Sequence, residues 1–78
     1  DMGYKAGIAE AASNMGNIHT QQGNYDRAIQ DYLEALKLYE ELRQSERVGT
    51  TLNALGISYS KRGNNRQSLE MYEKARIV

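Results

Sequence analysis

The chain has 78 residues, and its ten Lys and Arg residues balance its ten Asp and Glu residues, so the formal net charge is zero. A nucleic-acid binder usually carries a basic excess, because neutralising phosphates supplies much of its affinity, so this balance argues against RNA or DNA as a partner. Cysteine is absent and His19 is the single histidine, which excludes disulfides, thiolate metal sites and multi-histidine metal clusters.

The first predicted element is a helix near residues 5–22. Ile8, Ala12, Met15 and His19 recur there at spacings of three and four, which places them on one stripe of a helix. We expect this stripe to face the core. His19 could be a general base or a lone metal ligand, but its place on the stripe favours a packed, hydrogen-bonded histidine.

A turn at residues 22–24 follows this helix. Gly23 can adopt the left-handed conformation that ends a helix, and Asn24 can cap the next helix with its side-chain oxygen. The second helix is predicted near residues 25–43. Its apolar face is formed by Tyr25, Ala28, Ile29, Tyr32, Leu36 and Tyr39.

The remaining chain repeats this scheme. A third helix is predicted near residues 46–62, Gly63 and Asn64 form the turn, and a fourth helix is predicted near residues 65–77. The expected core residues of these two helices are Val48, Leu52, Leu55, Tyr59, Leu69, Tyr72 and Ala75.

A shift of 40 residues superimposes the two halves, with Gly16 on Gly56 and Tyr32 on Tyr72. The chain therefore divides into units 1–40 and 41–78. A glycine inside a helix costs about 1 kcal/mol relative to alanine, so the paired glycines need a reason. We predict close helix packing, with Tyr32 or Tyr72 filling the space beside each glycine.

Each unit carries the same degenerate motif. The motifs read Ala12-x-x-Met15-Gly16-x-x-His19 with Ala28-x-x-x-Tyr32, and Leu52-x-x-Leu55-Gly56-x-x-Tyr59 with Ser68-x-x-x-Tyr72. This pattern resembles the tetratricopeptide repeat family. The resemblance implies an all-α fold of two tandem helix-turn-helix repeats, in which four antiparallel helices form a short right-handed superhelix segment.

The repeat length departs from the family. The usual period is 34 residues, and the six extra residues here lie between Ala35 and Leu55. We therefore assign the chain to a longer, 40-residue variant of the repeat. Two units leave both ends unpaired, although about three are usually needed for stability, so residues 1–78 are expected to be a module of a longer array or to self-associate.

In the family, the first helices of successive repeats line a concave groove that holds a partner peptide. The resemblance thus implies a protein-interaction scaffold that binds a peptide or helix of another protein. The residues of each first helix that lie off the core stripe would line the groove, and asparagine amides there can both donate to and accept from a peptide bond. These residues are Glu10, Ser13, Asn14, Asn17, Thr20, Gln21, Thr50, Asn53, Ile57, Ser60 and Lys61.

Other interpretations of these residues stay open. The polar residues could be an ordinary solvated face, and Ile57 could be a partner contact or a lone exposed isoleucine. A carboxylate clamp known in part of the family is disfavoured, because Ser13 and Ala54 stand where its lysine and one asparagine are expected. The acidic residues Glu40, Glu41 and Glu46 are explained more simply by a solvated face than by a metal site.

No arrangement of nucleophile, base and acid is visible, so no enzyme activity and no cofactor are expected. The main alternative function is structural, a segment that stacks in a longer solenoid without its own ligand. No apolar run approaches the roughly 20 residues that cross a bilayer, and residues 1–12 lack the features of a signal peptide. We therefore expect a cytoplasmic protein.

Overall fold

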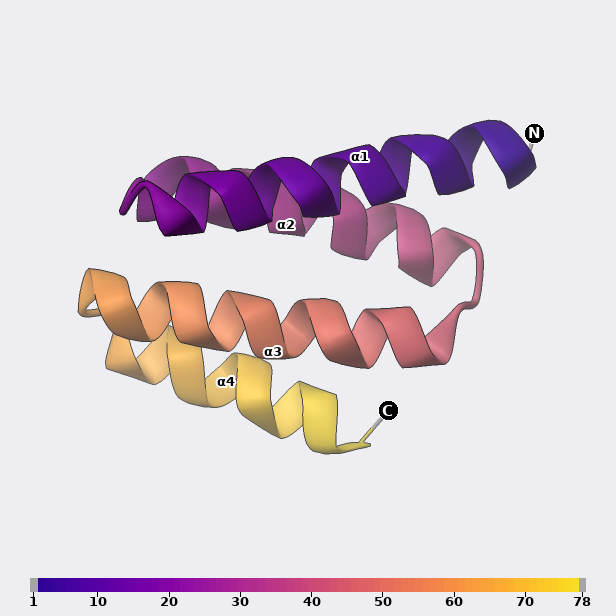
Figure 1. Ribbon diagram of the computed structural model, residues 1–78. Coiled ribbons are helices and arrows are strands. Elements are labelled where there is room, and N and C mark those ends of the chain that lie inside the picture. The colour runs from indigo at the N-terminus through magenta and orange to yellow at the C-terminus, as the bar shows by residue number, and fades with distance from the viewer. Residues whose placement is uncertain (1, 78) are drawn as a thin grey trace.

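The structure is a computed structural model, and it describes residues 2–77; the predicted module limits Asp1 and Val78 lie outside them. The described residues form four α-helices and no strand: α1 (Met2–Gln21), α2 (Tyr25–Glu41), α3 (Ser45–Arg62) and α4 (Asn65–Ile77). The all-α prediction is confirmed. Consecutive helices pack in pairs, so that the chain forms two helical hairpins, α1–α2 and α3–α4, with α2 against α3 between them (Figure 1).

The two predicted glycine turns end α1 and α3. Gly23 and Gly63 have positive φ angles of 77° and 96°, the left-handed region that glycine adopts without a steric cost. In each turn the glycine amide and the following asparagine amide donate to carbonyls of the helix just ended. The Asn24 side chain also accepts from the Arg27 amide at 3.5 Å, so Asn24 caps α2 as predicted.

The turn between α2 and α3 has the same geometry without a glycine. Arg43 has a φ of 57°, and the amides of Arg43 and Gln44 donate to the carbonyls of Glu40 and Tyr39. An L residue with a side chain pays about 1–2 kcal/mol in this region, so the turn stores local strain. The sequence analysis did not identify this turn as a left-handed one.

The core draws on all four helices, and most of its residues belong to the two inner helices, α2 and α3. Small residues let the helices approach, and larger side chains fill the space around them. The buried apolar residues are Ala9, Ala12, Ala28, Ile29, Tyr32, Ala35, Tyr39, Val48, Leu52, Leu55, Tyr59 and Met71.

The structure corrects three predicted core residues at the two ends of the stack. Met15 is 45% exposed, because α2 is the one described helix that packs extensively against α1 and the buried side of α1 runs through Ala9, Ala12 and Gly16. In α4, Leu69 is 65% exposed and Tyr72 is 39% exposed, because no described helix covers the outer side of α4. Met71, which was not predicted, is buried there instead.

The paired helix glycines do have the predicted neighbours. A Cβ atom added at Gly16 would lie 2.6 Å from the Tyr32 ring, and one added at Gly56 would lie 2.7 Å from the Tyr72 ring. Both distances are far below ordinary van der Waals contact, so the missing side chains are what allow α2 and α4 to approach α1 and α3. Ser68 strengthens the second contact by donating to the Gly56 carbonyl at 2.7 Å.

Candidate functional site

The predicted groove residues form one stripe on α1 and one on α3. Spacings of three and four along a helix place side chains on the same side of it, and both stripes follow this rule. Ser13 and Thr20 are half-buried. The exposed members are Glu10, Asn14, Asn17, Gln21, Thr50, Asn53, Ile57, Ser60 and Lys61.

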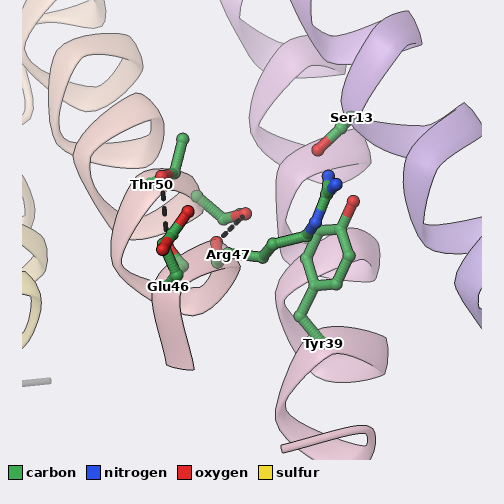
Figure 2. A pocket seen from close by; sticks show the side chains of 6 residues that line it. Ser13, Tyr39, Glu46, Arg47 and Thr50 are labelled. Carbon is green, nitrogen blue, oxygen red and sulfur yellow. Dashed lines mark hydrogen bonds between the residues drawn. The ribbon is translucent and has the colours of Figure 1, made fainter. Parts of the chain in front are cut away.

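A pocket of about 290 Å³ opens between α1, α2 and α3. Ser13 of α1 and Thr50 of α3 both line it, so the structure brings these two predicted residues together. The other lining residues are Tyr39 of α2 and Glu46, Arg47 and Thr51 of α3 (Figure 2). None of the remaining nine predicted residues lines this pocket.

Arg47 and Tyr39 form the charged and aromatic part of the pocket. The Arg47 guanidinium carbon lies 5.7 Å from the centre of the Tyr39 ring, within the range of a cation–π contact. Tyr39 belongs to the predicted core and is buried, whereas Arg47 is exposed. Arg47 was not predicted as a site residue, although its position one turn before Thr50 and Thr51, next to the expected groove stripe, was a usable signal.

Several groove residues are already engaged inside the chain. Asn17 accepts a hydrogen bond from the Tyr32 hydroxyl at 2.5 Å, so its amide NH₂ group is the part free to meet a partner. Thr20 donates to the Gly16 carbonyl and Thr50 to the Glu46 carbonyl, each one turn back on its own helix. Asn53 makes no hydrogen bond through its side chain within residues 2–77.

His19 is packed and hydrogen-bonded, as predicted. Its Nδ1 lies 2.6 Å from Oδ2 of Asp31, and both side chains are largely shielded from solvent. The pair joins α1 to α2, neither residue lines the pocket, and no hydroxyl or thiol of the described chain is hydrogen-bonded to the ring. The contact is therefore a link between two helices.

The acidic residues follow the solvated-face interpretation. Glu41 pairs with Lys5 at 3.3 Å, and both side chains are substantially exposed. Among the described residues, no group of three or more His, Asp or Glu side chains is placed to hold a metal ion. No described helix is both long enough and apolar enough to cross a membrane.

Comparison with known protein families gives a match over nearly the whole chain. The family model described as a tetratricopeptide repeat covers residues 7–76, which includes most of both predicted units and all eleven predicted groove residues. No curated protein and no solved structure matches the chain.

Proposed function

The chain belongs to the tetratricopeptide repeat family, whose repeats are generally protein-interaction modules and typically non-catalytic, and on this premise we propose that it is a non-enzymatic scaffold. The proposed ligand is an extended peptide or a helix of another protein. It would lie across the stripes of α1 and α3 that contain Asn17 and Asn53. The proposed site is the full set of eleven groove residues, in a cytoplasmic protein of the 40-residue repeat variant.

The observation that carries this proposal is the pocket between α1, α2 and α3. It joins Ser13 of one predicted stripe to Thr50 of the other. A partner lying across the two helices would therefore meet a continuous polar surface with one recess in it. Exposed asparagines beside this recess offer donors and acceptors to a peptide backbone.

The test is a selection of peptides from a random display library against the full chain, followed by affinity measurements on variants. Asn53→Ala should weaken the selected peptides about fivefold, since one hydrogen bond is worth about 1 kcal/mol. Asn17→Asp keeps the acceptor for Tyr32 and removes the amide donor, so it should weaken binding without unfolding α1 from α2. Asn65→Ala, an exposed asparagine at the start of α4, is the matched control.

Two results would contradict the scaffold proposal. One is the absence of any selected peptide that binds above background. The other is a set of binders whose affinities stay the same in Asn53→Ala and Asn17→Asp. Unfolding measurements on each variant separate lost binding from lost structure.

A second candidate function is stacking, and the exposed apolar residues of α1 and α4 favour it. Leu69 and Tyr72 are exposed on α4, whereas Ile29 and Tyr32 at the equivalent positions of α2, which lies between α1 and α3, are buried. We propose that the outer side of α4 can receive the Met15 side of α1 from another copy or repeat, as α2 receives α3. Sedimentation over a range of concentrations tests this: Leu69→Gln should lower self-association, and a strictly monomeric wild-type chain would contradict stacking between copies.

A further inference from the structure

The pocket between α1, α2 and α3 contains three hydrogen-bond donors that have no partner in the described part of the chain. Tyr39 is only 3% exposed, yet its hydroxyl makes no hydrogen bond with any residue from 2 to 77. The Ser13 hydroxyl and the Arg47 guanidinium are equally unpaired over that range, and no carboxylate there lies within ion-pair distance of Arg47. The other two hydroxyls are used, because Thr50 and Thr51 donate to carbonyls of their own helix.

The three donors converge. The Arg47 side chain is held over the Tyr39 ring, and Figure 2 shows its guanidinium beside the Tyr39 hydroxyl, with the Ser13 hydroxyl above the guanidinium. The Tyr39 ring is buried, but its unpaired hydroxyl is not, because no fully buried side-chain oxygen or nitrogen among the described residues lacks a hydrogen-bond partner. The hydroxyl therefore opens onto the pocket. An acceptor entering the pocket would replace water at this hydroxyl and would cost little side-chain freedom, because packing already fixes the ring.

The chemistry of the donors selects an anion. A guanidinium offers a planar fork of N–H groups that matches the two oxygens of a carboxylate, and the two hydroxyls can donate to the same oxygens. The pocket also lies at the first turn of α3, where the helix dipole favours negative charge, and the residue preceding this helix, Gln44, makes no side-chain cap there.

Glu46 decides which anion is suitable. Its carboxylate lines the same pocket as Arg47 and repels incoming negative charge. A carboxylate carries one charge, whereas a phosphomonoester carries about −1.5 to −2 at neutral pH, so Glu46 penalises phosphate more strongly. The volume of about 290 Å³ is enough for one short acidic side chain.

We propose that this pocket binds the carboxylate of an aspartate or glutamate side chain of the partner, with Arg47, Tyr39 and Ser13 as its ligands. The inference rests on the proposed function, since the acidic residue belongs to the peptide that lies across α1 and α3. It adds a specificity: among peptides that fit the groove, those with one acidic residue at the pocket bind best.

The experiment uses the full chain, labelled with ¹⁵N, and two capped tripeptides, Ac-Ala-Glu-Ala-NH₂ and Ac-Ala-Gln-Ala-NH₂. The NMR signals of the Arg47 side-chain Nε–H and of the amides of residues 46–51 report binding directly. The glutamate tripeptide should bind about tenfold more tightly than the glutamine one, the expected gain from a charge-assisted hydrogen bond at a partly exposed site. Inorganic phosphate should bind more weakly than the glutamate tripeptide.

Variants assign the effect to the pocket. Arg47→Gln should remove the preference for glutamate, and Tyr39→Phe, which keeps the ring under the guanidinium, should reduce it about threefold. Arg66→Gln changes the charge equally at an exposed site on α4 and should leave the preference intact. Spectra of the free variants confirm that each is folded.

The outcomes separate this inference from the proposed function. Equal binding of both tripeptides, a preference that survives in Arg47→Gln, or tighter binding of phosphate would overturn the carboxylate site. Library peptides that bind through Asn17 and Asn53 without any acidic preference would overturn it too, while leaving the scaffold proposal standing. A glutamate preference in the tripeptides without any binding of longer peptides would support the pocket and contradict the groove.

Discussion

The first and second helical hairpins follow one sequence pattern and yet bury different members of it. Leu55 on α3 is fully buried, while Met15, 40 residues earlier on α1, is 45% exposed. The reverse holds for the second helices, where Tyr32 of α2 is 4% exposed and Tyr72 of α4 is 39% exposed. The burial of a repeat position is thus decided by the helix that packs against it. Among the described helices, the inner ones, α2 and α3, each pack extensively against two others, and the outer ones, α1 and α4, against one.

The largest test of this difference compares Leu55→Ala with Met15→Ala. Removing a fully buried leucine should lower the free energy of unfolding by about 3 kcal/mol, because a cavity remains between α2 and α3. Met15→Ala should cost less than about 1 kcal/mol, since its side chain is already half in water. Urea unfolding followed by circular dichroism measures both, and equal losses would contradict the contrast between inner and outer helices.

The helix glycines give the next contrast. Gly16→Ala should cost about 2 kcal/mol, because the added methyl group meets the Tyr32 ring, which is buried and held by its hydrogen bond to Asn17. Gly56→Ala should cost less than about 0.5 kcal/mol, because the exposed Tyr72 ring can move away and alanine favours the helix. Thermal unfolding measures the difference in stability between the two variants. A greater loss of stability in Gly56→Ala would mean that Tyr72, and not Tyr32, is the ring that cannot move away.

The tyrosine hydroxyls differ because their partners differ. Tyr32→Phe should lower the free energy of unfolding by about 0.5–1 kcal/mol through loss of the bond to Asn17. Tyr72→Phe should change it by less than about 0.3 kcal/mol, since Ile57 stands where Asn17 would be and offers no acceptor. Repeating Tyr72→Phe in an Ile57→Asn background sharpens the test: a cost close to that of Tyr32→Phe should appear, and its absence would show that the pair depends on more than the acceptor.

The smallest expected effect concerns the three turns. Arg43→Gly should raise the free energy of unfolding by about 0.5 kcal/mol, because relief of the left-handed strain exceeds the added freedom of glycine in the unfolded chain. Gly23→Ala makes the opposite change in the first turn and should lower it. A loss of stability in Arg43→Gly would mean that the Arg43 side chain makes a compensating contribution.

The helices and their glycine turns were predictable because their signals are local. The three-and-four spacing of apolar residues, Gly23 and Gly63 after each first helix, and Asn24 as a cap all act within a few residues of the chain. The left-handed Arg43 was missed for the same reason, since arginine has no propensity that indicates such a turn. The family assignment rests on these same local motifs, repeated at a distance of 40 residues.

The candidate site was only partly predictable. Ser13 and Thr50 were identified by their places on the two first helices, and the family match implies that such helices belong to an interaction module. Arg47 and the Tyr39 hydroxyl were not identified. Tyr39 occupies a core position, and nothing in the sequence pattern indicates that its hydroxyl reaches a pocket. Convergence of side chains from three helices is a property of their packing angles and separations.

The sequence by itself determined the helices, their two glycine turns, the glycine–tyrosine contacts and the family, because each depends on spacing along the chain and on what single residue types allow. Only the tertiary structure decided which apolar residues are buried and which donors lack a partner. Burial and hydrogen bonding are relations between neighbours in space. Met15 and Leu55 occupy the same position of one repeat, and only the helix packed on the far side distinguishes the exposed residue from the buried one.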